Sequence, residues 1–362
     1  MPVRVQEAIE AFARGEIVVV TDDDDREGEG DLIVAAVHCT AEKMAFIVRH
    51  TSGIVCAPIT QAEARRLRLD PMVAHNDSNH ATAFTVSVDY KPGMTTGISA
   101  EERTSTCRGL ANPNAGANDF ARPGHIFPLI AKDGGVLMRS GHTEAAVDLC
   151  TMAGLPPVGV ICELVNDDGT VTKGRQVADF AAKHGLKHVT IADMIAWRQV
   201  REKLVERVSS FEVETPIGPM QGHAYRTPFD DVYHLAFVYG SIGRGERILA
   251  RFHKPNILTD IFMASPKVSM ALQRFKADGC GVLICLRDGA AGVPLTPLEK
   301  PSSSDEQRNE RWREVGVGAQ ILRDLGVSSI RNLSSSNRSF PGLAGFGIEI
   351  IETETLDPEV AG

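Results

Sequence analysis

An acidic segment near the amino terminus holds the densest group of chemically active side chains. Residues 22–31 read DDDDREGEGD, with seven carboxylates directly after the apolar run EIVVV. Carboxylates crowded in this way repel one another unless a cation or a polar substrate neutralises them. The segment indicates a metal or substrate site, with a solvated acidic turn as the plain alternative. It is not an EF-hand loop, because Val34 stands where a bidentate glutamate is needed and a strand-like run precedes it.

A second cluster, Arg139-Ser140-Gly141-His142-Thr143-Glu144, opens a predicted helix. The free N–H groups of a helix N-terminus beside an arginine favour a phosphate, and a glycine lets the ligand approach the backbone. The imidazole of His142 adds a candidate metal ligand. Helix N-termini with serine and threonine are common, so this cluster alone also fits an ordinary helix start.

Two further residues are notable for their surroundings. His125 follows an Arg-Pro-Gly turn that presents its imidazole on a rigid backbone, although a lone histidine is more often structural. Glu163 lies within the apolar run VGVICELV, where a carboxylate needs a partner or a function. His75 and His80 have no third ligand at a suitable spacing, so we do not expect them to bind a metal.

These clusters are rich in carboxylate oxygens and poor in imidazoles and thiolates. Such a set suits a divalent cation that holds an oxygen-rich, phosphorylated small molecule. Oxygen donors favour Mg²⁺ or Mn²⁺ over Zn²⁺. We therefore expect a magnesium or manganese site and no zinc.

The composition restricts the class of protein. The 362 residues include 38 Lys and Arg against 47 Asp and Glu, a formal net charge of −9, which argues against a nucleic-acid partner. No apolar run is long enough to span a membrane and no signal peptide is evident, so we expect a cytoplasmic protein without a membrane partner. The seven cysteines include no CxxC pair, which predicts reduced thiols and no structural zinc.

The elements that must position these residues alternate between helix and strand. Helices are predicted at 1–15, 61–69, 143–154, 177–185 and 191–207, with a further helix that begins at Thr40–Lys43, and strands at 16–20, 52–60, 81–90 and 158–165. Residues 108–124, rich in Gly, Asn and Pro, are expected to form a loop. Antiparallel strands follow from about residue 207, with a hairpin predicted at Gly240, Gly243 and Gly245.

We therefore predict two α/β domains, residues 1–207 and 208–362. The first should contain a mixed sheet flanked by helices. The second should contain an antiparallel portion.

The first domain resembles 3,4-dihydroxy-2-butanone 4-phosphate synthase of riboflavin biosynthesis. The resemblance covers residues 1–205 and rests on DDDDREGEGDL, HTSGIVCAPIT, TAFTVSVD, MTTGISAEER, RPGHIFPL, RSGHTEAAVDL and ICELVNDDGT, in family order. Gly28 is a departure, since the family usually has asparagine there, but it removes no ligand. The resemblance implies conversion of D-ribulose 5-phosphate to formate and a four-carbon ketone phosphate, using Mg²⁺, in a homodimer with sites at the subunit interface.

The resemblance also implies roles for particular residues. Glu27 and His142 match the metal ligands, and His125 and Glu163 match residues essential for catalysis. The substrate-binding positions correspond to Arg26, Glu27, Asp31, Arg139, Ser140, Gly141, His142, Thr143 and Glu163. Further candidates for substrate contact or acid–base work are Glu29, Thr96, Ser99 and Arg103. We expect Glu163 and His125 to be the main proton carriers, while the assignment of each proton among these residues, Glu29 and Asp31 stays open.

Residues 208–362 resemble GTP cyclohydrolase II in ILARFH, VGVGAQILRDLGV and FPGLAGFGIEI. The family's three zinc cysteines correspond to Asn256, Lys267 and Ser269, none of which is a thiolate. Further losses are Arg311 in place of an acidic residue and Ser339 in place of lysine. We therefore expect this domain to fold without hydrolysing GTP and to serve a structural or regulatory role. The alternatives are a bifunctional enzyme that also hydrolyses GTP and a non-catalytic regulatory protein.

Overall fold

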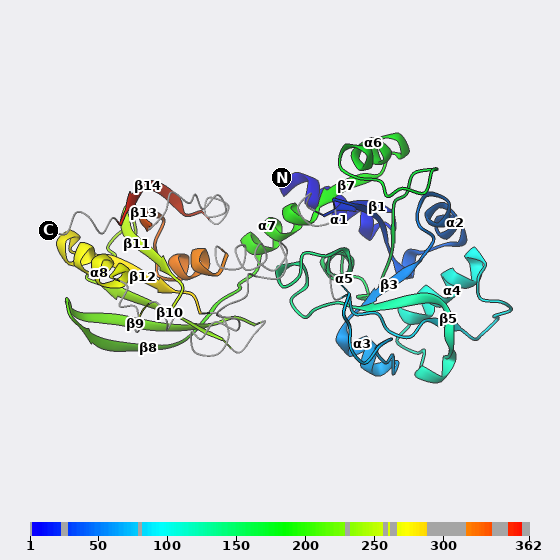
Figure 1. The fold of residues 1–362 in the computed structure, drawn as a ribbon, viewed down its shortest axis with the longest axis horizontal. Helices are drawn as coiled ribbons and strands as arrows, with labels where there is room; N and C mark the ends of the chain where they lie inside the picture. Colours follow the sequence, from blue (N-terminus) through cyan, green and yellow to red (C-terminus); the bar gives the residue numbers. More distant parts are fainter. Residues whose placement is uncertain are drawn as a thin grey trace. The chain divides into compact units, whose positions relative to one another are not determined.

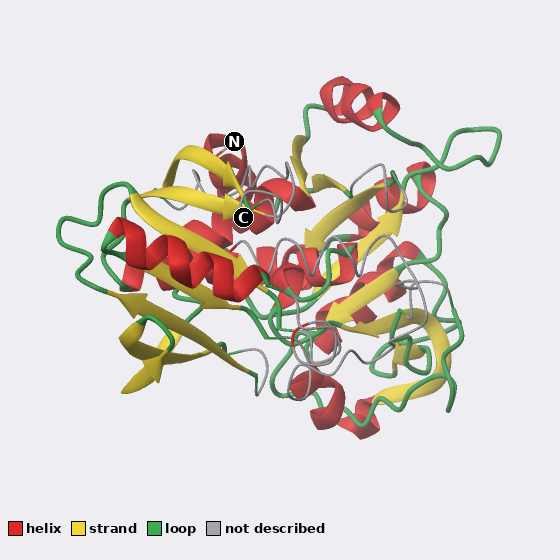
Figure 2. Cartoon of the chain, turned by 60° about the vertical axis from the view of Figure 1, so that its left-hand side comes forward, coloured by secondary structure: helices red, strands yellow, loops and turns green. Residues whose placement is uncertain are grey.

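The computed structural model describes residues 2–22, 28–78, 82–228, 232–255, 260, 266–287, 316–334 and 347–356. The chain divides into two compact units, Met1–Trp197 and Arg198–Gly362 (Figure 1). Each unit combines a mixed sheet with helices, which confirms the predicted α/β class (Figure 2). Among the described residues, no helix is long and apolar enough to cross a membrane.

The first unit is built on a sheet with the strand order β4-β5-β3-β6-β2-β1-β7. Its strands are β1 Val18–Thr21, β2 Gly30–Ala35, β3 Cys56–Ile59, β4 Val88–Tyr90, β5 Phe120–Ile130, β6 Gly159–Glu163 and β7 Lys187–Thr190. Its helices are α1 Pro2–Ala13, α2 Ala41–His50, α3 Gln61–Arg66, α4 Ala100–Leu110, α5 His142–Met152, α6 Arg175–His184 and α7 Ile191–Arg201, which continues past the unit's end. The β3/β5 and β1/β7 pairs are parallel, and the other pairs are antiparallel.

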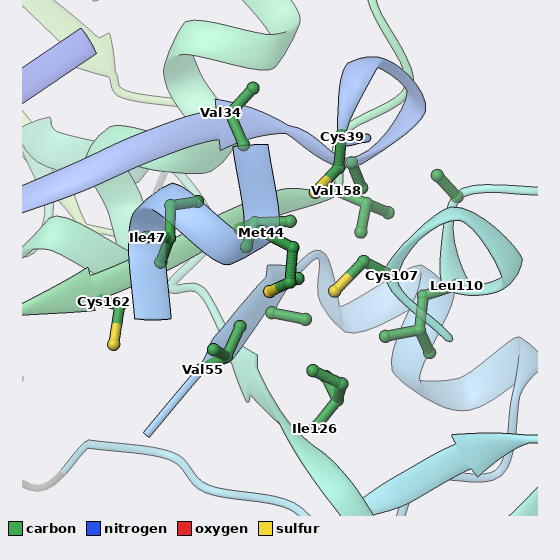
Figure 3. Close-up of a cluster of buried hydrophobic side chains, with 14 of the residues drawn as sticks. Val34, Cys39, Met44, Ile47, Val55, Cys107, Leu110, Ile126, Val158 and Cys162 are labelled. Atoms are coloured by element: carbon green, nitrogen blue, oxygen red, sulfur yellow. The ribbon is translucent and has the colours of Figure 1, made fainter. Parts of the chain in front are cut away.

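Side chains alternate between the two faces of this sheet and so define two layers. Leu32, Val160 and Ile126 face a buried apolar cluster that includes Met44 of α2 and Cys107 of α4 (Figure 3). Helices α1 and α5 pack on the sheet separately from this cluster, with α5 against β1, β2, β3 and β6. Strand residues next to a cluster residue therefore point to the opposite face of the sheet, which α5 covers. The candidate site lies on this α5 face.

The local signals for helices α1, α2 and α3 are confirmed. The chain leaves α1 through Gly15, whose φ of +89° is easily reached only by glycine. The Thr40 side chain accepts a hydrogen bond from the Lys43 N–H and caps α2. Thr60 caps α3 in the same way through the Glu63 N–H.

Three predicted segments differ from the structure. The helix predicted at 191–207 ends at Arg201, and a strand begins at Glu206. The 108–124 segment is not one loop, because it contains the end of α4, a 3-10 turn at Ala117–Asp119 and the start of β5. Within 82–90 the regular strand is limited to Val88–Tyr90, while Phe84 and Thr85 form isolated bridges. Alternating apolar side chains fit both a regular strand and a segment with isolated bridges. Backbone pairing, which the local sequence does not show, decides between the two.

The second unit contains a sheet with the order β14-β13-β11-β12-β10-β9-β8. Its elements are β8 Glu206–Thr215, β9 Gly218–Arg226, β10 Tyr233–Tyr239, β11 Ile248–His253, α8 Lys267–Asp278, β12 Gly281–Cys285, β13 Ser329–Ser334 and β14 Glu349–Thr355, with a further helix at 316–324. Strands β8, β9, β10 and β12 pair antiparallel, which confirms the expected antiparallel portion.

The hairpin predicted at Gly240, Gly243 and Gly245 is wrong. Strand β12 lies between β10 and β11, antiparallel to the first and parallel to the second. The glycine segment therefore connects strands that are not neighbours. A glycine turn between two strand-like runs indicates a reversal of the chain, but it does not show whether another strand lies between them.

The seven cysteines are free, as predicted, and all except Cys280 are buried.

Candidate functional site

The strand register brings three candidate side chains to one end of the first sheet. Asp31 of β2 lies opposite both Val20 of β1 and Glu163 of β6. His125 and Glu163 each lie two residues beyond a row formed by Phe127, Cys56 and Ile161, and in the same direction. Because a step of two residues preserves the face of a strand, His125, Glu163 and Asp31 all point to the α5 side of the sheet.

Helix α5 brings His142 to this row. Its Nδ1 atom lies 3.7 Å from Asp31 Oδ1, and its Nε2 atom lies 3.2 Å from the Val20 carbonyl oxygen. His142 is only 7% exposed and Asp31 only 2% exposed. The imidazole and the carboxylate are therefore held together in a buried position at the helix N-terminus.

The residue that begins α5 is Gly141, which has no side chain to cap the first turn. A Cβ at this position would lie 2.6 Å from Arg139 Nη1 and 2.8 Å from Glu144 Oε2, so glycine is needed where the Arg139–Glu144 ion pair crosses the turn. The Ser140 Oγ atom is buried and has no hydrogen-bond partner within the described ranges. Backbone N–H groups, a serine hydroxyl and a nearby arginine form a suitable setting for an anion.

The two ends of the acidic segment, Asp22 after β1 and Glu29 before β2, are joined by hydrogen bonds. The Glu29 N–H donates to Asp22 Oδ1 over 2.9 Å, and the Asp22 N–H donates to the Glu29 carbonyl oxygen over 3.3 Å. Glu29 also forms an ion pair with Lys173, with Nζ and Oε1 3.2 Å apart. Arg26 and Glu27 lie outside the described residues, but the two ends of their segment are placed next to Asp31.

Asp89 orients the imidazole of His125. Its Oδ2 atom lies 2.7 Å from His125 Nδ1, and its Oδ1 atom accepts the His125 N–H over 2.9 Å. Asp89 is buried, while 41% of the His125 side chain is exposed. The Asp89 carboxylate accepts a hydrogen bond from the Nδ1–H of His125, which leaves Nε2 as the atom available to a substrate.

Ser52 orients the carboxylate of Glu163. Its hydroxyl donates to Glu163 Oε2 over 2.7 Å, and its N–H donates to the Glu163 carbonyl oxygen over 2.9 Å. Arg103 supports this turn, because its Nη1 atom donates to the carbonyl oxygen of Gly53 over 3.2 Å. Arg103 is 8% exposed, so a buried guanidinium lies behind the turn that carries Ser52.

The segment that contains Thr96 and Ser99 is held by Glu102. The Thr95 N–H and the hydroxyls of Thr95, Thr96 and Ser99 all donate to the Glu102 carboxylate. The Thr95 bonds lower the pKa of Glu102 to about 2. Gly97 lies against the Asp89–His125 pair, because a Cβ on it would be 2.1 Å from Asp89 Oδ2 and 2.8 Å from His125 Nδ1. Thr96 and Ser99 thus bond to Glu102 and anchor a segment that closes over the Asp89–His125 pair.

The cysteine next to the site is not poised as a nucleophile. Burial raises the pKa of the Cys56 thiol well above its usual value, and the charge of Glu163 raises it further. A thiol in this environment stays protonated, whereas nucleophilic chemistry requires a thiolate.

The expected metal ligands fall only partly within the described part of the chain. Within that part, no three His, Cys, Asp or Glu side chains form a group that could hold a metal ion. Thr143 follows His142 on α5 and is buried with it. His142 is therefore the described member of the expected ligand pair, and Glu27 belongs to the adjoining segment.

Sequence reasoning missed Asp89, Ser52 and Gly97. The signal for Asp89 was present, because a carboxylate ends the apolar run TVSVD just as Glu163 does in VGVICE. Ser52 and Gly97 gave no such signal, since small polar residues and glycines are common in loops.

In the second unit, two of the three positions where the related family has zinc cysteines are described. Lys267 begins α8, and the Ser269 hydroxyl donates to the Pro266 carbonyl oxygen over 2.8 Å. Asn256, Arg311 and Ser339 lie outside the described residues. Beside these positions, His253 Nε2 lies 2.9 Å from Asp260 Oδ2.

Together, the fold and the site define an α/β protein with acid–base side chains in a row that faces a helix N-terminus. The family model for 3,4-dihydroxy-2-butanone 4-phosphate synthase matches residues 6–197, and the model for GTP cyclohydrolase II matches residues 206–355. The chain belongs to the 3,4-dihydroxy-2-butanone 4-phosphate synthase family, with a GTP cyclohydrolase II domain fused behind it.

Relatives match over nearly the whole chain. Riboflavin biosynthesis protein RibBA of Bacillus cereus is 42% identical over 98% of this chain and 93% of its own. The bifunctional riboflavin biosynthesis protein RIBA 1 of Arabidopsis thaliana is 44% identical over 96% of this chain and 68% of its own.

Solved structures match as well. RibBX of A. baumannii, described as a two-domain 3,4-dihydroxy-2-butanone 4-phosphate synthase, is 35% identical, with a TM-score of 0.83 over 97% of this chain and 99% of that one. A 3,4-dihydroxy-2-butanone 4-phosphate synthase in complex with two magnesium ions is 49% identical, with a TM-score of 0.52 over 53% of this chain and 94% of that one.

Proposed function

We propose that the first unit converts D-ribulose 5-phosphate into 3,4-dihydroxy-2-butanone 4-phosphate and formate, with Mg²⁺ or Mn²⁺. The observation that carries this proposal is the row of His125, Glu163 and Asp31 facing the N-terminus of α5. Membership of the synthase family supports the reaction, and the magnesium ions of the related structure support the cofactor.

The substrate would lie between the sheet row and α5. Arg139, Ser140, Gly141 and Thr143 would bind its phosphate through the helix N-terminus, and Arg26 would add a further charge. Glu27 and His142 would hold the cation, and Asp31 would bind a substrate hydroxyl. The buried imidazole beside a carboxylate fits an oxygen-rich cation site. When bound, such a cation supplies charge stabilisation for an enediolate.

His125 and Glu163 are proposed as the main proton carriers. The proton on C3 must be removed by a base, and the departing C1 hydroxyl must be protonated by an acid so that it leaves as water. The hydrogen bond from Ser52 keeps Glu163 aimed into the site, and Asp89 leaves His125 Nε2 ready to exchange a proton. The double change Glu163→Gln with His125→Asn should abolish formate release, and near-full turnover would refute the assignment.

We further propose a cytoplasmic homodimer. Ile54 and Ile98 are 54% and 52% exposed, and both lie next to site residues in the chain. Large apolar side chains at the rim of a polar site favour a covering partner, for which a second copy is the simplest choice. Sedimentation of the full chain tests this, and a monomer at enzyme concentrations that show turnover would contradict it.

For the second unit we propose a structural or regulatory role without GTP hydrolysis. Opening the purine ring requires a zinc-activated water, and zinc here would need thiolate ligands. Lys267 instead supplies a cation, and the Ser269 hydroxyl is hydrogen-bonded to the Pro266 carbonyl oxygen. The related two-domain structure is described only as the synthase, which agrees with this proposal.

A bifunctional enzyme is the second candidate, because the Arabidopsis relative is described as bifunctional and the GTP cyclohydrolase II model matches. Zinc analysis of the purified chain and an assay for formate from GTP separate the two. Stoichiometric zinc with GTP-dependent formate would support the bifunctional enzyme. A purely regulatory protein would release no formate from either substrate.

A further inference from the structure

Four aromatic rings join α2 to α6 on the face of the sheet away from α5. Phe46 and His50 come from α2, and Phe180 and His184 come from α6. All six pairs among these rings are in contact, with centroids 4.4–6.3 Å apart. We call this group the ring box. It is half-buried and contains two imidazoles 5.1 Å apart.

The start of α6 and the turn before it hold the end of the acidic segment. A Cβ on Gly30 would lie 2.4 Å from Val177 Cγ1, so Val177 packs directly on the backbone of Gly30. The Gly174 N–H donates to the Gly28 carbonyl oxygen over 3.2 Å, and Lys173 pairs with Glu29. These contacts cover the residues immediately before Asp31.

The ring box disfavours a charged imidazole at His50. Burial lowers the pKa of His50, and the neighbouring His184, Arg49 and Lys183 lower it further, against an opposing effect of Asp167. A second proton would place two positive imidazoles within ring contact, beside two fixed cations. Charging the box therefore weakens the contact between α2 and α6.

We propose that the ring box is a pH-sensitive latch on α6, and that the latched helix positions residues Gly28–Asp31 for the site. The latch is closed at neutral pH, where the tilted and edge-to-face ring contacts hold α6 against α2. It opens in mild acid, and the contacts of Lys173, Gly174 and Val177 with the acidic segment loosen with it. The geometry of the latch does not depend on the proposed reaction; only its effect on turnover rests on the proposed function.

The pH range in which the latch is closed follows from the lowered pKa of His50. Because the folded pKa lies below the ordinary value of 6.5, the latch is intact above that value. Its stability falls as the pH drops below it toward the lower folded pKa.

The test is amide hydrogen exchange of the full chain on both sides of about pH 6.5, corrected for intrinsic rates. We expect residues 172–184 and 28–31 to lose protection together in acid. The double change His50→Phe with His184→Phe keeps four rings and removes the titration, so its protection should not change with pH. His75→Gln, at an exposed histidine outside the box, is the matched control and should behave as the unmodified chain.

Two results would overturn the proposal. One is unchanged protection of residues 172–184 in the unmodified chain below about pH 6.5, a result that needs no variant to fold. The other is loss of protection in residues 172–184 without any change in residues 28–31. The acid limb of formate release should also move to lower pH in the double variant; absent turnover at all pH values would count against the proposed function, while the exchange result still decides the latch.

Discussion

At the residue scale, the site depends on side chains that orient other side chains. Asp89 holds the ring of His125 through two contacts, and Ser52 holds the carboxylate of Glu163 through one. Neither supporting residue is among those that the sequence singled out. Fixed orientation of an acid–base group removes the cost of finding the reactive geometry at each turnover.

Asp89→Asn should lower kcat strongly while leaving the fold intact. The amide can donate to His125 Nδ1, which moves the ring proton to Nε2 and leaves the wrong tautomer facing the substrate. We expect a loss of at least about a hundredfold, the lower range for general acid–base catalysis. Formate release under saturating substrate measures it, with Asp179→Asn on the exposed face of α6 as the control. An unchanged kcat would show that His125 needs no orientation by Asp89.

Ser52→Ala should have a smaller effect than Glu163→Gln. Loss of a hydrogen bond to a charged group costs about 1.5–3 kcal/mol, which corresponds to roughly a ten- to hundredfold change if it is fully felt in turnover. Ser105→Ala, at an exposed position in α4, is the matched control. Equal turnover for Ser52→Ala and Ser105→Ala would remove Ser52 from the account.

At the element scale, periodicity and capping residues predicted most helices and the strand that carries Glu163, but not β2, which carries Asp31. Strand β5 was not predicted, because its first residues are rich in turn formers. Phe120 and Ala121 are extended through pairing with β4, and residues 127–130 pair with β3. The sequence grouped His125, Glu163 and His142 only through the family resemblance. The row itself follows from strand order, and strand order is a long-range property that local patterns do not contain.

Gly30→Ala tests the packing of α6 on β2. The new methyl group would overlap Val177, so we expect destabilisation by about 1–3 kcal/mol. Val177→Ala in the same chain should recover part of that loss, since it removes the atoms that clash. Thermal unfolding of the single and double variants measures the coupling, and Gly116→Ala, where the nearest atom is 3.8 Å away, is the control. Additive losses would contradict direct contact.

The anchor of the 95–102 segment should persist in acid. Because hydrogen bonds from Thr95 lower the pKa of Glu102 from 4.5 to about 2, its contribution to stability is complete above pH 4.5 and is lost as the pH falls through about 2. An NMR titration of the Glu102 carboxyl carbon checks the midpoint. Thr95→Val should raise that midpoint, because it removes one donor; a midpoint near 4.5 in the unmodified chain would refute the anchor.

At the scale of the whole molecule, the two units are built on separate sheets. The acidic residues of the chain are most closely spaced in residues 22–31, and the described end of this segment, 28–31, leads into β2. The second unit keeps a mixed sheet and two apolar clusters of its own. A core and a site are specified by different residues, so these apolar clusters do not depend on the chemistry of Lys267 or Ser269.

Formate release from D-ribulose 5-phosphate by the purified full chain tests the central claim most directly. The account predicts release with Mg²⁺, loss of release after treatment with EDTA, and recovery when Mg²⁺ is returned. Circular dichroism on the same samples would show that the fold is unchanged by EDTA. A folded chain that releases no formate from this substrate with Mg²⁺ present would contradict the account.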